Sequence, residues 1–205
     1  MRVGAVVLAA GSASRFGGDK LSAELAGRPV LRHVLDAAVA AGLEPIVVVV
    51  PPDDRLAAVS LSPARSVVNP NPNEGLSSSV RLGLRALGAD ATQPPLDAAV
   101  ILPGDQPRIR PAVIAALVDA AAASPDTPFV AARHRDDRAP NPVLARHAVW
   151  RLADELAGDR GFGPLLASRP ELLRWLDVDG ANPDVDTPAD LDRLAGTEPG
   201  RSDVS

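Results

Sequence analysis

Three short stretches of this sequence combine residue types that could bind phosphate or a metal ion: LAAGSASRFGGDK (8–20), VILPGDQP (100–107) and DVDTPADL (184–191). The first is rich in small residues, so its backbone N–H groups could approach an anion closely. It also holds Arg15, a forked donor, and Lys20, a compact charge and the only lysine of the chain. These residues predict a polyphosphate-binding loop, and a turn with solvated basic residues is the alternative.

The second and third stretches supply carboxylates. Asp105 follows an apolar run typical of a buried strand, where an isolated carboxylate is costly unless it is paired or bound to a metal ion. The alternative for G-D-x-P is a turn in which the aspartate caps its own backbone. Thr187 and Pro188 followed by Asp190 are typical of a helix start, so capping alone could account for Thr187 and Asp186. Both stretches therefore admit a metal site or a purely structural role.

The elements that must position these residues follow from hydrophobic patterning. Six short apolar or β-branched runs predict strands at 3–8, 45–50, 65–68, 98–103, 128–132 and 174–178. Capped or amphipathic stretches predict helices at 29–41, 76–87, 111–123, 147–157 and 188–194. This alternation predicts an α/β sandwich with a mainly parallel sheet. Ligands of such sheets bind outside the carboxyl ends of the strands, where the loops 8–20 and 100–107 begin.

Composition limits the protein class. The 205 residues, 46% of them apolar, fit one globular domain, which we place at 1–195 with a flexible polar tail at 196–205. The net charge of −5 argues against general nucleic-acid binding. There is no cysteine, no apolar run long enough to span a bilayer and no signal-peptide pattern at the start. We therefore expect a soluble cytoplasmic protein that contacts neither membrane nor nucleic acid.

The spacing of the first loop fits neither G-x-x-x-x-G-K-[ST] nor G-x-G-x-x-G. LAAGSASRFGGDK instead resembles the signature loop of the MobA-like NTP transferases, and most closely their molybdenum cofactor cytidylyltransferase branch. Further matches follow in order to about Leu194. The resemblance implies a Rossmann-like three-layer α/β sandwich of the nucleotidyltransferase type, with a mainly parallel, mixed sheet.

The resemblance also implies where the nucleotide binds. Arg15 and Lys20 would neutralise its phosphates, and Gly75 and Ser79 would lie near base and ribose through the shared pattern G-x-x-x-S-V-x-x-G-L. Other residues expected along the nucleotide are Leu8, Ala9, Ala10, Gly11 and Ser12. For the neighbouring Ser77 and Ser78, capping of the helix start is the alternative. Arg81 on the same helix is expected at the surface.

The family resemblance also implies metal-binding roles for two of the carboxylates. Asp105 corresponds to the family's metal-binding aspartate, and Asp186 to the first aspartate of V-D-T-P-x-D-L in related sugar cytidylyltransferases, which helps to hold Mg²⁺. Mg²⁺ typically takes one or two carboxylates together with substrate phosphates and water. Asp190 would then act only on the helix dipole. The expected cofactor is Mg²⁺ on Asp105 and Asp186.

The second substrate is expected at APNPVLA (139–145) and LAGDRGFGPLL (156–166), through Asn141, Pro142, Asp159 and Gly161. The sequence departs from the family pattern here. Asn141 stands where glycine is common, and Gly163 where an arginine suited to a phosphorylated pterin is frequent. Arg160 lies nearby and could replace that arginine. A turn after a helix is the alternative for Asp159 and Gly161.

The remaining candidates carry no chemistry in this interpretation. His33, His134 and His147 lack ligand spacing and are expected at the surface. Trp150 and Trp175 are expected in the core.

The implied activity is Mg²⁺-dependent transfer of a nucleotidyl group to a phosphorylated acceptor, with release of pyrophosphate. Resemblance suggests CTP as donor and molybdopterin or its molybdenum-loaded form as acceptor. L-A-A-G in place of the L-A-G-G of guanylyltransferases is the only sequence argument for cytidine. A guanylyltransferase or sugar-phosphate nucleotidyltransferase on the same scaffold is one alternative. A non-catalytic protein that binds nucleotide or cofactor and delivers it to a molybdoenzyme is another, although Arg15, Lys20 and Asp105 argue against it.

Overall fold

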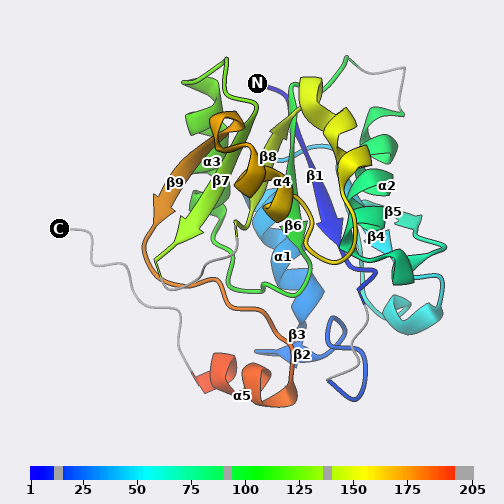
Figure 1. Ribbon diagram of the computed structural model, residues 1–205. Coiled ribbons are helices and arrows are strands. Elements are labelled where there is room, and N and C mark those ends of the chain that lie inside the picture. The colour runs from blue at the N-terminus through cyan, green and yellow to red at the C-terminus, as the bar shows by residue number, and fades with distance from the viewer. Residues whose placement is uncertain (12–15, 90–93, 136–139, 197–205) are drawn as a thin grey trace.

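The computed structural model describes residues 1–11, 16–89, 94–135 and 140–196. Its centre is a seven-stranded sheet with the strand order β5-β4-β1-β6-β8-β7-β9, flanked by helices (Figure 1). These strands are β1 (Val3–Leu8), β4 (Ile46–Val50), β5 (Arg65–Val68), β6 (Ala98–Pro103), β7 (Phe129–His134), β8 (Val143–Arg146) and β9 (Leu173–Val178). A separate two-stranded ribbon pairs β2 (Glu24–Leu25) with β3 (Arg28–Pro29). The sheet is mixed because β8 runs antiparallel to β6 and β7, while every other neighbouring pair is parallel.

Helices cover both faces of this sheet. The helices are α1 (Val30–Ala40), α2 (Leu76–Gly88), α3 (Pro111–Ala122), α4 (Gly163–Ser168) and α5 (Pro188–Gly196), and the 3-10 segments are η1 (Asp54–Leu56), η2 (Pro72–Glu74), η3 (His147–Glu155) and η4 (Pro170–Leu172). Residues of α1 and α3 share one hydrophobic cluster with one face of β1, and residues of α2, η3 and α4 share a second with its other face. The result is the expected three-layer sandwich.

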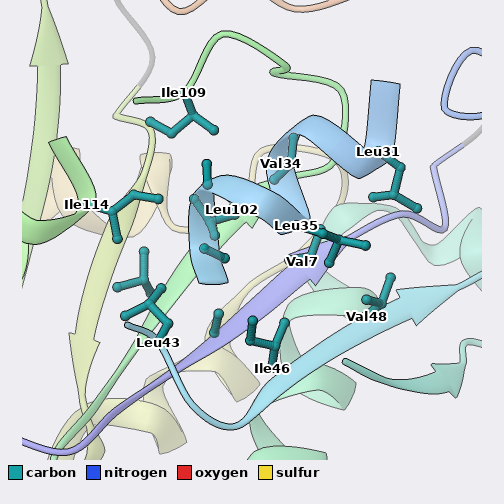
Figure 2. Close-up of a cluster of buried hydrophobic side chains, with 14 of the residues drawn as sticks. Val7, Leu31, Val34, Leu35, Leu43, Ile46, Val48, Leu102, Ile109 and Ile114 are labelled. Carbon is teal, nitrogen blue, oxygen red and sulfur yellow. The ribbon is translucent and has the colours of Figure 1, made fainter. Parts of the chain in front are cut away.

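The continuous apolar run of β1 is a direct consequence of this layering. Val7 belongs to the cluster with α1 and α3, whereas Val6 and Leu8 belong to the cluster with α2. Figure 2 shows Val7 beside Leu35 of α1 in the first cluster. A strand covered on both faces needs apolar residues at every position, since alternate side chains point to opposite layers.

The predicted strands and helices are confirmed to within a few residues, apart from the segment 147–157. β2, β3, β8 and α4 were not predicted from the sequence. Residues 147–157 were predicted as a helix, but His147–Glu155 forms 3-10 turns. The tail from 197 onward lies outside the described residues. Within the described part of the chain, no helix is both long and apolar enough to cross a membrane.

Two expectations about single side chains are wrong. His134 is buried in β7 because it lies under the elements that flank that strand, and not at the surface. Trp175 is 40% exposed on the edge strand β9, where the Arg133 guanidinium lies 5.4 Å from its ring centre. That contact replaces the core packing expected for this tryptophan. Trp150 is only half-buried, with its ring edge-on to His147.

Candidate functional site

A cavity of about 920 Å³ lies at the carboxyl ends of β1 and β6, as expected for a parallel sheet. It is lined by most of the residues predicted for the site: Leu8, Ala10, Gly11, Lys20, Gly75, Ser79, Asp105, Asn141, Asp159, Gly161 and Asp186. Ala9 packs in the core instead and, like Pro142, does not line the cavity. Ser12 and Arg15 lie outside the described residues. Lys20 and Asp186, which are 166 residues apart in sequence, therefore meet in one cavity.

Lys20 lies between the two carboxylates that the sequence singled out. Its Nζ donates to Asp105 Oδ2 at 2.6 Å and to Asp186 Oδ1 at 3.0 Å. The lysine side chain is 11% exposed, and those of Asp105 and Asp186 are 25% and 35% exposed. Burial alone would lower the pKa of Lys20, but the charges and hydrogen bonds of Asp105 and Asp186 outweigh it and raise the pKa. The ammonium group is therefore charged at neutral pH and holds both carboxylates at one point.

Backbone contacts between three loops bring these side chains together. Gly104 N donates to Leu8 O at 2.9 Å, which joins the loop after β6 to the end of β1. A Cβ at Gly104 would lie 2.7 Å from that same oxygen, so the close approach requires glycine. Val185 N in turn donates to Asp105 O at 2.9 Å. The segment that carries Asp186 is thus joined to the loop that carries Asp105.

Gln106 strengthens this connection, and sequence reasoning did not find it. Its side chain is buried, with Nε2 donating to Asp184 Oδ1 at 2.6 Å and Oε1 accepting from Asn182 Nδ2 at 2.8 Å. Both ends of one amide therefore bind the segment that leads to Asp186. A local signal for this role is absent, because the partners lie 76 and 78 residues further along the chain.

The start of α5 next to Asp186 has the expected capping arrangement. Asp190 accepts from the Thr187 backbone N–H and hydroxyl, both at 2.8 Å, and from the Asp186 N–H at 3.2 Å. These hydrogen bonds lower the pKa of Asp190, chiefly through the Thr187 hydroxyl. Asp190 acts on the helix start as predicted, while the carboxylate of Asp186 remains on Lys20 in the cavity.

The start of α2 forms another wall of the cavity. Its first amides are satisfied by a distant loop, since Leu76 N donates to Asp159 Oδ1 at 3.2 Å and Ser77 N to Gly158 O at 3.1 Å. Gly75 precedes them with a φ of 89°, and a Cβ there would lie 2.6 Å from Asp159 Oδ1. Asp159 thus caps a helix more than 80 residues away.

The alternative of a serine cap at this helix is wrong. The hydroxyls of Ser77 and Ser78 donate to the carbonyls of Glu74 and Gly75 and do not accept from free amides. Arg81, expected at the surface, is partly buried and donates to Leu156 O at 2.8 Å, which also joins α2 to the distant loop. Gly75 is therefore needed for the close contact between the start of α2 and the loop at Asp159, whereas Ser77 and Ser78 bind backbone carbonyls just before α2.

The charged lining includes two arginines with different surroundings. Arg55, which the sequence analysis missed, pairs with Asp53 at the cavity wall. Arg160 lines the cavity too, and its guanidinium has no partner among the described residues. The sequence around Arg55, PPDDRLAA, matches no motif that would mark this arginine as part of a binding site.

The donor set suits a hard divalent ion that is completed by substrate. Among the described residues, no group of three or more His, Cys, Asp or Glu side chains forms a closed metal site. Asp105 and Asp186 nevertheless bind a single cationic nitrogen, so their oxygens can face one ion. One or two carboxylates, with phosphate and water as further ligands, is the usual environment of Mg²⁺. The residues present therefore fit the expected cofactor.

Comparison with known proteins agrees with this arrangement. The crystal structure of Rv0371c from Mycobacterium tuberculosis H37Rv superposes with a TM-score of 0.83 at 30% identity, covering 96% of this chain and 98% of that one. Rv0371c has also been crystallised in complex with manganese, and that structure gives a TM-score of 0.79 at 28% identity over 97% and 100% of the two chains. CMP:2-keto-3-deoxy-manno-octonic acid synthetase complexed with CTP shares the fold, with a TM-score of 0.75 at 17% identity over 95% and 97%.

Sequence comparison identifies the family. The bifunctional protein GlmU of Sorangium cellulosum (strain So ce56) is 35% identical over 135 residues, which are 61% of this chain. The chain spans only about a quarter (27%) of the length of that relative. Residues 5–173 match the family model of the MobA-like NTP transferase domain. With its mixed α/β sheet and the cavity at its carboxyl edge, the chain belongs to the MobA-like NTP transferase domain family and is a nucleotidyltransferase of that family.

Proposed function

We propose that this protein transfers CMP from CTP to the phosphate group of a molybdopterin-type acceptor and releases pyrophosphate. The observation that carries the proposal is the convergence of Asp105 and Asp186 on one cationic nitrogen at the wall of a 920 Å³ cavity. Two carboxylates facing one point can hold a divalent ion against a triphosphate. The other polar residues expected for the nucleotide, Gly11 and Ser79, line the same cavity.

Mg²⁺ is the proposed cofactor, held by Asp105 and Asp186. The manganese complex of Rv0371c, a protein of the same fold, supports a divalent ion as cofactor. When bound, the ion supplies charge stabilisation to the phosphates. Lys20 lies within hydrogen-bond distance of both carboxylates, so its ammonium would lie beside a phosphate bound at the same point and could donate to it.

The transfer needs no covalent protein intermediate. An oxygen of the acceptor phosphate forms the new bond to the α-phosphorus, and the bond from that phosphorus to the bridging oxygen of the β-phosphate breaks. Pyrophosphate leaves with that electron pair, so negative charge builds on the leaving group. Lys20, and Arg15 of the same loop, are the cations proposed to stabilise it.

The donor and acceptor rest on different residues. Ala10, which distinguishes L-A-A-G from L-A-G-G, lines the cavity and supports cytidine over guanine. Asn141, Gly161 and Arg160 line the side proposed for the acceptor. Arg160 supplies there a guanidinium without a partner in the described part of the chain, suited to an anionic group, although Gly163 stands where the family frequently has an arginine.

Pyrophosphate release tests the proposal. The purified chain is assayed with Mg²⁺ and each of CTP and GTP, against molybdopterin, its molybdenum-loaded form and sugar phosphates. We expect turnover with CTP and molybdopterin, and a loss of roughly 100- to 1000-fold in Asp105→Asn. Preference for GTP, or for a sugar phosphate, would overturn the substrate assignment. A delivery protein would instead pass cofactor to a molybdoenzyme equally well in Asp105→Asn, without any turnover of NTP.

A further inference from the structure

We propose that Asn69 is a positioning residue that fixes the polarity of the Ser79 hydroxyl, so that the cavity presents a hydrogen-bond donor to an acceptor atom of the bound nucleoside. The proposal rests on the proposed function for the presence of a nucleotide in this cavity. It assigns a role to a residue outside the cavity wall, through the side chain that it orients.

The orientation of the Asn69 amide is determined by its neighbours. Asn69 is 2% exposed, directly after β5, and its backbone N–H donates to Val50 O at 2.8 Å. Its side-chain oxygen accepts from the Asn71 backbone N–H at 3.0 Å. Because a backbone N–H can only donate, the amide atom facing it must be the oxygen. The amide nitrogen therefore faces α2.

That nitrogen uses its two hydrogens on two neighbouring serines. Asn69 Nδ2 donates to Ser78 Oγ at 2.8 Å and to Ser79 Oγ at 3.0 Å. An amide nitrogen has no lone pair to accept a proton in return, so both hydroxyl oxygens are acceptors in these contacts. Each serine then has its own hydrogen left to donate elsewhere.

The two serines differ in where that hydrogen goes. Ser78 donates to Gly75 O at 2.8 Å, so its hydrogen-bonding capacity is used inside the protein. Ser79 has no acceptor for its hydroxyl hydrogen within the described part of the chain, and it lines the cavity although it is only 4% exposed. The donor of Ser79 is thus directed to whatever occupies the cavity.

A buried donor of fixed polarity selects its partner. An acceptor such as a base carbonyl, a ring nitrogen or a ribose hydroxyl oxygen satisfies the Ser79 hydrogen, whereas an N–H placed at the same point would leave that buried hydrogen without an acceptor. Ser79 belongs to α2, while Asp105 and Asp186 come from the loops next to β6 and α5. The nucleoside would therefore contact α2 and the triphosphate the charged loops.

A double-mutant cycle tests the relay. CTP binding is measured by calorimetry at pH 8 with Mg²⁺ for the full chain, Ser79→Ala, Asn69→Asp and the double variant. The introduced carboxylate still accepts from Asn71 N–H, but it also accepts the Ser79 hydrogen and so removes the donor from the cavity. We expect Ser79→Ala to weaken CTP binding about five- to tenfold in the parent and less than twofold in the Asn69→Asp background.

Two further measurements make the test specific. Ser78→Ala removes the neighbouring Asn69 contact without touching the cavity, so its CTP affinity should change less than twofold. With 2′-deoxy-CTP, a vanished effect of Ser79→Ala would place the acceptor on the ribose 2′-hydroxyl, and a persisting effect would place it on the base or on another sugar oxygen. Thermal unfolding checks that each variant folds, and Asn69→Ala replaces Asn69→Asp in the cycle if the latter does not.

The outcomes separate this proposal from the function on which it rests. If the parent binds CTP but Ser79→Ala binds it equally well, or costs the same in both backgrounds, Asn69 does not act through Ser79. If the parent binds no nucleoside triphosphate at all, the proposed function itself fails.

Discussion

Two walls of the cavity hold their polar side chains in different ways. We call them the carboxylate wall, which carries Asp105 and Asp186, and the acceptor wall, the side proposed for the second substrate, which carries Asn141 and Arg160. On the first, Asp105 and Asp186 both accept from Lys20, and Gln106 binds the segment that leads to Asp186. On the second, the side chains of Asn141 and Arg160 have no partner among the described residues.

This difference has a physical meaning. Groups that must stabilise charge in a transition state work best when they are held in place before the substrate arrives. The Arg160 guanidinium, which has no partner among the described residues, can instead adapt to a ligand, at the cost of ordering its side chain on binding.

Replacing Lys20 should have the largest effect, because it removes the centre of the carboxylate wall. We expect Lys20→Ala to lower turnover of the NTP about 100-fold while the chain stays folded. Steady-state pyrophosphate release and circular dichroism measure the two quantities. Lys20→Arg is the matched control for charge, and turnover at the parent level would show that the lone lysine has no special role.

The same ion pairs should give the protein a pH-dependent stability. Burial works against the charged ammonium, but Asp105 and Asp186 outweigh it and raise the pKa of Lys20 above that of the unfolded chain. The stabilisation is therefore complete below a pH of about 10.4 and is lost as the pH rises through the raised pKa. Urea unfolding of the parent and Lys20→Met at pH 8 to 11 should show a difference that shrinks only at the alkaline end. A constant difference would contradict the pairing.

Gly75→Ala should break the contact that joins the loop carrying Gly158 and Asp159 to the start of α2. Its φ of 89° and the 2.6 Å approach to Asp159 Oδ1 leave no room for a methyl group, so we expect a loss of roughly 1–3 kcal/mol in the free energy of unfolding. Gly163→Ala is the control, since that position has open space. Equal stability of the two variants in chemical denaturation would refute the close contact.

Gln106→Ala should loosen the carboxylate wall without removing any of its charges. Loss of the amide leaves the buried Asn182 side chain and the Asp184 carboxylate without this partner, so we expect about tenfold weaker Mn²⁺ binding and a cost of roughly 1–3 kcal/mol in stability. Manganese titration followed by electron paramagnetic resonance measures the affinity. Asn182→Ala removes one half of the same connection and should shift the affinity in the same direction by less.

Arg160→Ala should have the smallest effect, confined to the second substrate. Because the guanidinium has no partner among the described residues, its removal leaves the fold unstrained, and we expect a several-fold higher KM for the acceptor with CTP affinity unchanged. A change in CTP affinity of the same size would mean that both walls bind the nucleotide.

The sequence predicts those elements whose local sequence pattern alone reveals their surroundings in the fold. β1 and β6 are recognisable because strands covered on both faces are apolar throughout. β8 is not, because its sequence VLAR holds a single β-branched residue, whereas the equally short β5 ends in two valines. The pairing of β8 with β6 and β7 is what makes the sheet mixed.

The same limit applies to the site. Asp105 and Lys20 stand in loops after or near parallel strands, and their meeting could be expected from the position of those loops. Asn69 and Gln106 could not be selected, because an amide gains its role only from burial and from partners that the fold brings to it. A sequence motif indicates which groups can react, whereas the groups that orient them are visible only in three dimensions.

The 166-residue separation between Lys20 and Asp186 has a consequence for synthesis of the chain. A nascent polypeptide that has reached Val178 contains all seven strands of the central sheet, but it still lacks one of the two carboxylates. Contacts between distant segments close late because the loop entropy must be overcome first. The ion pair between Lys20 and Asp186 would therefore form late, and only a polypeptide synthesised past Asp186 could complete the proposed metal site.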